Sequence, residues 1–298
     1  MELKIFQVDA FTSKPFGGNP AGVVLDAKGL SENDMQNIAN EMNLSETAFI
    51  VPKDEHNYKV RFFTPISEVD LCGHATIGSF YTLAFKEIIS PLEEGVKKVY
   101  QETKAGRLGV EIHYKNGEIR KVMMEQSKPK DLGIVEDIDL LLDCFNIEKK
   151  DIGIEEKFVS PEIISTGLPD IMLPLKDKKT LDSLKVDFNK LIHLSSKVEV
   201  TGVHAFHLPY MDSDKVYTRN FAPLVGINEE AATGTANGGL VYFLKKGKYI
   251  KGKEILSIQG ESLKRPSKIY CEVSKDNGFY SIKVGGQARI VLEGFMYL

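Results

Sequence analysis

Apolar and polar residues alternate over many short segments of the chain, which is the pattern of β-strands with one buried face. Two pairs of these segments flank Asn-Gly turns, at 116–117 and 277–278, and therefore predict β-hairpins. The predicted strands are residues 5–10, 21–25, 48–51, 58–63, 109–114, 120–125, 269–273 and 280–284. An amphipathic helix is predicted over 31–42, with Ser31 as its N-cap.

Two further segments, 75–85 and 231–244, contain no charged residue. A helix that is apolar or small on all sides is a buried helix. The pattern therefore predicts an α+β fold of two similar domains, each a curved mixed β-sheet or barrel around one central helix. We place the domains at 1–127 and 128–298, with a last strand that is able to pack back on the first domain.

The two halves also repeat each other in sequence. The repeats, which lie 157 or 158 positions apart, are Arg61–Pro65 with Arg219–Pro223, Ala48–Pro52 with Ala205–Pro209, and Ala75-Thr76 with Ala232-Thr233. Matches in one register indicate an internal duplication, with the halves related by a pseudo-twofold axis. Such an axis predicts a cleft between the halves, a usual place for a ligand.

The same register shows where the halves differ in chemistry. Glu46 falls opposite Val203, and His74 falls opposite Ala231. An acid and an imidazole that occur in one half are our leading catalytic candidates. We expect Glu46 to be half-buried, so that desolvation raises its pKa and makes it a proton shuttle. We expect His74 to be neutral, because the positive end of a helix disfavours its protonated form.

Both uncharged helices begin with small residues, around Gly73 and Gly234. Small residues let a ligand approach the free N–H groups of a helix N-terminus, where anions such as carboxylates bind. Ordinary capping and tight packing are the alternative explanation, and Glu230 is equally able to serve as a stabilising charge at the helix end. The expected pocket is lined by Ser45, Glu46, Gly73, His74, Glu230, Gly234 and Thr235.

Composition restricts the class of protein. The 298 residues are 42% hydrophobic and 27% charged with a net charge of −4, which describes a globular protein without a nucleic-acid footprint. Three cysteines and no CxxC fit a reducing cytosol. No run approaches the ~20 apolar residues of a membrane span, so we expect a cytoplasmic protein with no membrane partner. His204 and His207 predict no metal site, because residues three apart on a strand face opposite sides.

Several segments, spread over nearly the whole chain, resemble the PhzF-like family, which is named for a phenazine-biosynthesis isomerase and shares its fold with diaminopimelate epimerase. They are Phe6–Phe11, Phe16–Gly22, Asn43–Phe49, Asp70–Thr76, Ser165–Pro169, Arg219–Pro223 and Val284–Gly286. The resemblance implies that Glu46 is the catalytic acid/base, that His74 is an active-site residue and that Asn19 lies among the substrate-binding residues. It also implies a homodimer without a cofactor.

The chain departs from the family at the second helix. Where the family commonly has Asp-Pro-Ala-Thr-Gly-Ser, this chain has Glu230 and Thr235 at the two ends of the motif. Glu for Asp lengthens the side chain by one methylene, and Thr for Ser adds a methyl group. Charge and hydroxyl are kept, but the pocket changes shape, so the resemblance favours isomerase chemistry over one particular substrate.

Three functions remain open from the sequence. The first is a cofactor-independent isomerase in which Glu46 moves a proton between carbons of a small carboxylate-bearing substrate. The second is a two-base epimerase or racemase of an amino acid, which requires a partner for Cys72; the repeat places Glu229 there instead of a second thiol. The third is a non-catalytic member that binds a small molecule or a protein.

Overall fold

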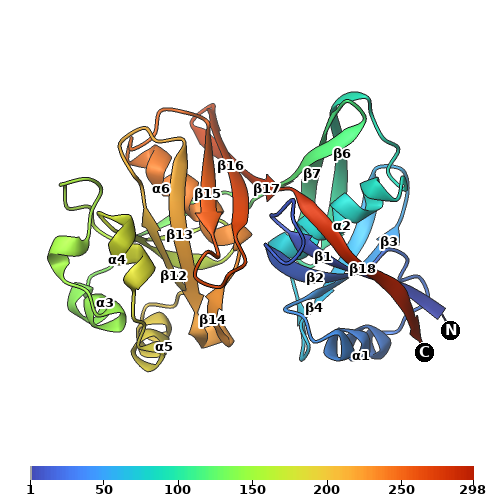
Figure 1. Ribbon diagram of the computed structural model, residues 1–298, viewed down its shortest axis with the longest axis horizontal. Coiled ribbons are helices and arrows are strands. Elements are labelled where there is room, and N and C mark those ends of the chain that lie inside the picture. Colours follow the sequence, from blue (N-terminus) through green and yellow to red (C-terminus); the bar gives the residue numbers. More distant parts are fainter. Residues whose placement is uncertain (1) are drawn as a thin grey trace. The chain divides into compact units, whose positions relative to one another are not determined.

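The computed structural model describes residues 2–298 and consists of two compact units (Figure 1). The N-terminal unit runs to Glu125 and resumes at Gly285, and the C-terminal unit is Gln126–Val284. The last strand, β18 (Ala288–Tyr297), belongs to the N-terminal unit, where it pairs antiparallel with β1 (Glu2–Ala10). No helix within residues 2–298 is long and apolar enough to span a bilayer.

The N-terminal unit is a curved sheet with one helix inside it and one outside. Its other strands are β2 (Asn19–Val24), β3 (Thr47–Pro52), β4 (Asn57–Phe63), β5 (Glu68–Val69), β6 (Glu94–Thr103), β7 (Gly106–Lys115) and β8 (Glu118–Glu125). Helix α2 (Gly73–Phe85) packs against β1, β2, β3, β7, β8 and β18. Ten of its 13 residues are buried, which confirms the buried helix predicted from its lack of charge.

Helix α1 (Glu32–Met42) lies on the other face of this sheet. Ser31 caps its N-terminus, and Asp34 completes a capping box; Asn43 adopts the left-handed conformation that ends it. Met35, Ile38 and Ala39 pack against strand residues that include Phe49 and Phe63. The predicted helix and its cap are confirmed.

The C-terminal unit has the same plan with more helices outside. Its strands are β9 (Lys130–Ile134), β10 (Glu162–Ser165), β11 (Pro169–Pro174), β12 (Gly202–His207), β13 (Lys215–Ala222), β14 (Ile227–Glu230), β15 (Glu254–Gln259), β16 (Ser267–Asp276) and β17 (Phe279–Gly286). Its helices are α3 (Ile138–Phe145), α4 (Lys178–Ser183), α5 (Phe188–Lys197) and α6 (Gly234–Lys246), with 3-10 turns η1 (Lys149–Asp151) and η2 (Pro223–Val225).

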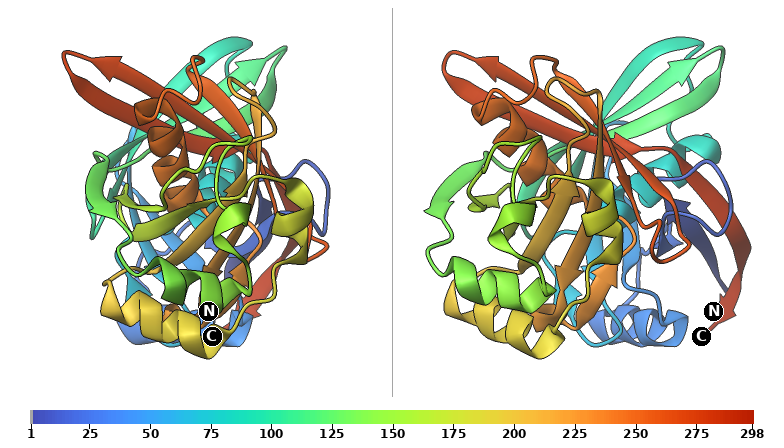
Figure 2. Two further views of the ribbon diagram at one scale, coloured as in Figure 1. Left: turned by 90° about the vertical axis from the view of Figure 1, so that its left-hand side faces the viewer. Right: turned by 60° about the vertical axis from the view of Figure 1, so that its left-hand side comes forward.

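Helix α6 packs against β10, β11, β12 and β16, whereas α3 and α5 lie side by side on the opposite face of the sheet (Figure 2). The alternation of side chains along the strands explains both layers. Ile171 and Leu173 of β11 contribute to the cluster under α3 and α5, while Met172, between them, points to α6 and Gly239.

The predicted duplication is confirmed by the order of strand pairings. From β1 to β7 the pairings are antiparallel β1–β2, parallel β2–β3, antiparallel β3–β4, parallel β4–β6 and antiparallel β6–β7. The order β10–β11–β12–β13–β15–β16 repeats this succession of orientations. Each unit is thus a mixed sheet around a central helix, as predicted; the sheets are open and curved, so the barrel form does not apply.

The register of the duplication differs from the one predicted. In the N-terminal unit Arg61 binds Glu68 through two hydrogen bonds of 2.7 Å, seven residues along the chain. In the C-terminal unit Arg219 binds Glu229 in the same way, at 2.8 Å and ten residues along. The C-terminal unit therefore has three extra residues after its arginine. The offset of 157 or 158 that relates the earlier segments of the two units does not apply to the central helices.

This insertion changes the counterparts of the helix residues. Both central helices have 13 residues, but α6 begins at Gly234, later than the predicted 231 or 232. Gly73 corresponds to Gly234, His74 to Thr235 and the N-cap Cys72 to the N-cap Thr233. The predicted counterparts Ala231, for His74, and Glu229, for Cys72, are wrong.

The counterpart of Glu46 changes as well. On β3, Phe49 lies opposite Arg61, whereas on β12 it is Ala205 that lies opposite Arg219. Three residues before each of these positions are Glu46 and Gly202. Gly202 is therefore the counterpart of Glu46 in the duplication, one residue before the predicted Val203. The position still holds an acid in one unit only, because its counterpart has no side chain at all.

Candidate active site

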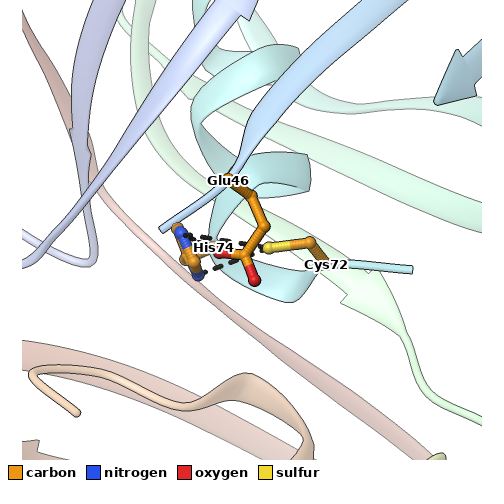
Figure 3. A group of neighbouring side chains, drawn as sticks. All are labelled: Glu46, Cys72 and His74. Atoms are coloured by element: carbon orange, nitrogen blue, oxygen red, sulfur yellow. Dashed lines mark hydrogen bonds and ion pairs between the residues drawn. The ribbon is translucent and has the colours of Figure 1, made fainter. Parts of the chain in front are cut away.

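Three chemically reactive side chains meet at the N-terminal end of α2: Glu46, Cys72 and His74 (Figure 3). Glu46 directly precedes β3, Cys72 is the N-cap of α2, and His74 is the second residue of the helix. Cys72 has extended backbone, and its side chain does not cap the helix, so the thiol is turned toward the other two groups. The parallel pairing of β2 with β3 fixes the position of Glu46, because Gly22 donates its N–H to the Glu46 carbonyl at 3.0 Å.

The imidazole of His74 is the centre of this group. Its Nε2 lies 3.1 Å from Oε2 of Glu46, and its Nδ1 lies 3.4 Å from Sγ of Cys72. The side-chain amide nitrogen of Asn19 lies 3.3 Å from the same Nδ1. The side chain of His74 is 4% exposed and that of Glu46 is 16% exposed, so the histidine is enclosed and the carboxylate reaches the surface.

The two charges hold each other in place. Burial alone raises the pKa of Glu46, but the attraction of His74 and its hydrogen bond outweigh burial and lower it. Burial alone lowers the pKa of His74, but its contacts with Cys72 and Glu46 outweigh burial and raise this pKa well above its ordinary value. The two shifts favour the carboxylate form of Glu46 and the protonated form of His74.

Two expectations from the sequence are therefore wrong: the raised pKa of Glu46 and the neutral state of His74. Each expectation treated its residue alone, in contact with a helix end or an apolar surrounding. In the fold each residue is the other's counter-ion, and a direct contact between opposite charges outweighs a partial helix charge.

Cys72 is a thiol in this setting. Burial, followed by the negative charge of Glu46, raises its pKa to about 11. A thiol with this pKa does not ionise near neutral pH, so Cys72 is a poor base and a poor nucleophile in the free protein.

Glu46, Cys72 and His74 also lie close enough together to hold a metal ion. One ligand atom from each lies within 4.8 Å of the others. Carboxylate, thiolate and imidazole are the ligand types of zinc sites. The sequence analysis considered a metal site at His204 and His207 instead, and rejected it. His204 is fully buried beside Asn220, and His207 contacts the carbonyl of Leu175.

The other candidates from the sequence gather at the N-terminal end of α6. Glu230 ends β14, and its Oε2 accepts a hydrogen bond of 2.7 Å from the hydroxyl of Thr233, the N-cap of α6. Gly234 and Thr235 form the first turn, and the carbonyl of Thr235 accepts a hydrogen bond from Thr166 at 2.9 Å.

The structure thus brings the predicted residues together in two groups. Asn19, Ser45, Glu46, Gly73 and His74 belong to the N-terminal unit, and Glu230, Gly234 and Thr235 belong to the C-terminal unit. Ser45 is exposed, next to Glu46 in the chain. The cleft expected between the halves stays a prediction.

The sequence analysis missed Asp170. This residue is 2% exposed on β11, and burial together with the charge of Glu230 raises its pKa to about 7. The signal was present: Asp170 follows the family-like segment Ser165–Pro169 and is the one charged residue in an otherwise apolar strand.

Comparison with known proteins places the chain in a family. A sequence model described as phenazine biosynthesis-like protein (PhzC-PhzF) matches residues 8–294. The chain belongs to this family. This PhzF-family protein is 37% identical to an uncharacterized isomerase of Clostridium acetobutylicum, over 100% of this chain and 99% of the relative. It is 30% identical to the trans-2,3-dihydro-3-hydroxyanthranilate isomerase of Pseudomonas chlororaphis, over 88% of this chain and 87% of the relative.

Solved structures agree with this assignment. A phenazine biosynthesis protein of the PhzF family from Bacillus anthracis superposes with a TM-score of 0.87 at 28% identity, with 100% of both chains covered. A hydroxyproline epimerase from Agrobacterium vitis, at 13% identity and a TM-score of 0.61 over 99% of this chain and 91% of its own, shares the fold. The PhzF-family protein is an enzyme, an isomerase, as the sequence indicated.

Proposed function

We propose that this isomerase moves a proton between carbons of a small carboxylate-bearing substrate, without a cofactor, and that Glu46 is its general acid/base. The observation that carries the proposal is the carboxylate of Glu46, 16% exposed, held against the buried imidazole of His74, 3.1 Å away, at the N-terminus of α2. An ionised carboxylate at the edge of an enclosed site can take a proton, and a neighbouring imidazolium can stabilise the negative charge that this creates.

The proposed step begins with a carbon–hydrogen bond of the substrate. Its electron pair stays with the substrate as a delocalised carbanion, and the proton forms an O–H bond on Glu46. Glu46 then returns the proton to a different carbon, so the carboxylate is regenerated and no oxidant or reductant is used. His74 stays beside Glu46 throughout, with Nε2 at 3.1 Å from Oε2 of the carboxylate, and Asn19 and Cys72 lie against the other side of the ring, at Nδ1.

The carboxylate of the substrate is proposed to bind at the N-terminus of α2. The first helical turn begins at Gly73, which has no side chain to keep a ligand away, and the N-terminal end of the helix carries partial positive charge that favours an anion. A bound carboxylate adds a negative charge beside Glu46 and excludes water. Both effects raise the pKa of Glu46 and make Glu46 a stronger base.

The named relative acts on trans-2,3-dihydro-3-hydroxyanthranilate, a cyclic carboxylate. We propose a related small cyclic or amino carboxylate for this chain. Glu230 and Thr235 stand where the family commonly has Asp and Ser, so the N-terminal end of α6 has a longer acid and a bulkier hydroxyl residue.

The direct test is proton exchange. A panel of small cyclic and amino carboxylates is incubated with the protein in deuterated buffer, and loss of carbon-bound hydrogen is followed by NMR. The proposal predicts exchange in at least one compound, which Glu46→Gln abolishes. Glu41→Gln is the matched control, because Glu41 is an exposed residue of α1 and its loss should leave exchange unchanged. Exchange that persists in Glu46→Gln contradicts the proposal.

One observation favours a second function, a two-base epimerase: the thiol of Cys72 lies in contact with His74 beside Glu46. In that case Cys72 and Glu46 serve opposite faces of one carbon. The raised pKa of Cys72 weighs against it, because the thiol stays protonated near neutral pH.

A further inference from the structure

The contact group of Glu46, Cys72 and His74 contains one more reactive side chain than the proposed isomerisation uses, because the thiol of Cys72 transfers no proton in it. A carboxylate, a thiol and an imidazole together are a set of ligands that binds zinc in proteins. Within residues 2–298, no other three His, Cys, Asp or Glu side chains come together closely enough to hold an ion. The ligand set therefore points to a metal ion at the N-terminal end of α2.

The spacing of the ligand atoms fits a zinc ion. Bonds of about 2.0–2.2 Å to nitrogen or oxygen and about 2.3 Å to sulfur place tetrahedral ligands about 3.4 Å apart for a nitrogen–oxygen pair and about 3.6 Å apart for a nitrogen–sulfur pair. In the structure, Nε2 of His74 lies 3.1 Å from Oε2 of Glu46 and 3.9 Å from Sγ of Cys72. Each distance differs from the tetrahedral value by about 0.3 Å, so small side-chain rotations bring the three atoms around one ion.

The backbone already holds the three ligands in place. Thr76 binds the carbonyl of Cys72 twice, with its N–H at 3.0 Å and its hydroxyl at 2.8 Å. Gly22 donates its N–H to the carbonyl of Glu46 at 3.0 Å, and His74 is fixed as the second residue of α2. Ligands on elements that are positioned by other contacts need little rearrangement to bind an ion.

Asn19 supplies the outer partner that a zinc-binding histidine ordinarily has. Such a histidine donates the N–H of its second ring nitrogen to a polar group. Nε2 of His74 faces Glu46, and the side-chain amide of Asn19 lies 3.3 Å from the other nitrogen, Nδ1. Asn19 is 3% exposed, and a half-turn of its amide presents the oxygen to an Nδ1–H.

Charge and access also favour zinc. One thiolate and one carboxylate balance the two positive charges of Zn²⁺, so the enclosed group has no net charge with the ion bound. The side chain of Glu46 is 16% exposed and that of His74 is 4% exposed, so an ion reaches the group from the carboxylate. Mg²⁺ and Ca²⁺ take six or more oxygen ligands, which a group with one thiol and one imidazole does not offer.

The C-terminal unit shows that the fold does not require this ligand set. The counterparts of Glu46, Cys72 and His74 in the duplication are Gly202, Thr233 and Thr235. None of the three is a usual zinc ligand, yet the same kind of helix N-terminus forms around them. The ligand set therefore belongs to the chemistry of the N-terminal unit.

We propose that Glu46, Cys72 and His74 bind one zinc ion through Oε2, Sγ and Nε2, and that this ion is a reversible inhibitor of the isomerase. Water or a small anion takes the fourth ligand position. The protons of the thiol and of Nε2 pass to water as the bonds to zinc form, and no atom changes its oxidation state. A carboxylate oxygen that is bonded to zinc does not accept a proton from carbon; the inhibitory part of the proposal therefore rests on the proposed function.

Binding is tested without a substrate, on protein free of any affinity tag, with Co²⁺ as a spectroscopic probe. One equivalent of Co²⁺ should produce a thiolate-to-cobalt absorption band in the near ultraviolet, which an excess of Zn²⁺ removes. Cys72→Ser should lose this band. Cys271→Ser is the matched control and should keep it, because Cys271 is also a buried thiol but lies on β16, where it donates to the carbonyl of Ile269.

A second variant tests the carboxylate ligand. Glu46→Gln keeps the thiol but removes the charged oxygen, so the Kd for Zn²⁺, measured by competition with a chromophoric chelator, should rise by more than about 10²-fold; loss of an outer partner alone costs about 10–100-fold. Glu41→Gln, on exposed α1, should leave this Kd unchanged. A cobalt band that persists in Cys72→Ser, or equal zinc affinity in Glu46→Gln and the unsubstituted protein, would overturn the proposal. Circular dichroism checks that each variant is folded.

Inhibition is tested on carbon–hydrogen exchange in buffers of fixed free Zn²⁺. Zinc at its Kd should halve the exchange rate, a chelator should restore it, and Mg²⁺ should have no effect. In Cys72→Ser, half-inhibition relative to the same variant without zinc should require about 10²-fold more Zn²⁺. Exchange that continues while the cobalt band shows the group to be occupied would overturn the inhibitory role. If no substrate is found, the proposed function fails, while the cobalt and zinc titrations still decide whether the metal site exists.

Discussion

The contact between Glu46 and His74 shows why charge states predicted for each residue separately were wrong. Each side chain is buried enough for its charge to be unfavourable alone, and each is stabilised by the other across 3.1 Å. The identity of both residues was readable from the sequence, but their protonation states depend on a contact between positions 28 residues apart.

The pair predicts a change in pH dependence for His74→Asn. Loss of the cation leaves burial as the main influence on Glu46, so the pKa of Glu46 should rise. The carboxylate form is the base, and it is lost as the pH falls through this pKa. The acidic limb of the kcat/KM profile should therefore move to higher pH, which a rate series over several buffers measures. An unshifted limb would show that His74 does not set the basicity of Glu46.

Cys72→Ser distinguishes the two reaction types. A one-base isomerase should keep nearly all its activity. A thiol with a pKa of about 11 stays protonated at neutral pH, so Cys72 does not act as a base. A two-base epimerase should lose activity to the same extent as the Glu46 variant, on the order of 10²–10⁴-fold. Parallel measurement of kcat in both variants decides between them.

Asp170 predicts how stability changes with pH. The folded protein binds the proton of Asp170 with a pKa of about 7, and the unfolded chain with a pKa of about 3.9. The stability that comes with this proton is fully present below the unfolded pKa and is lost as the pH rises through about 7. Asp170→Asn cannot lose a proton there, so relative to the unsubstituted protein it should gain on the order of 2–4 kcal/mol between about pH 4 and 8. Urea unfolding at both pH values measures the difference; equal changes in both proteins would contradict the assignment.

At the scale of elements, the two central helices carry most of what the sequence could reveal. An uncharged helix has to be enclosed, and the sequence located both within a few residues. The boundary error at α6 has a specific cause: the segment between Arg219 and Glu229 is three residues longer than that between Arg61 and Glu68. The repeated ion pair reveals this insertion only once the fold shows which arginine binds which glutamate.

Gly202 gives a prediction at this scale. Gly202→Ala places a Cβ 2.0 Å from the carbonyl oxygen of Phe221, so β12 and β13 would have to move apart. We expect a loss of about 2 kcal/mol or more in unfolding free energy, from strain in a packed sheet. Gly252→Ala is the matched control, because a Cβ there meets only ordinary contacts at 3.6 Å or more. Thermal unfolding of both variants checks the prediction, and equal midpoints would contradict it.

For the whole molecule, the sequence was sufficient for the class of fold and the family. Alternating strands, two Asn-Gly turns and the repeated Arg-x-Phe-x-Pro segments define two similar sheets, and the structure has them. The sequence was insufficient for Asp170. The raised pKa of this residue comes from its burial between β10 and β12 and from the charge of Glu230. Such a group becomes visible only when distant strands are aligned, because burial and a like-charged neighbour are tertiary properties.

The central claim is that Glu46 transfers the proton. Glu46→Gln keeps the shape of the side chain and its hydrogen bonds but cannot accept a proton. With a substrate identified by exchange, the account predicts that Glu46→Gln binds it with nearly unchanged affinity while turnover falls by about 10²–10⁴-fold. Turnover and carbon–hydrogen exchange that survive in Glu46→Gln but vanish in Cys72→Ser would contradict the account.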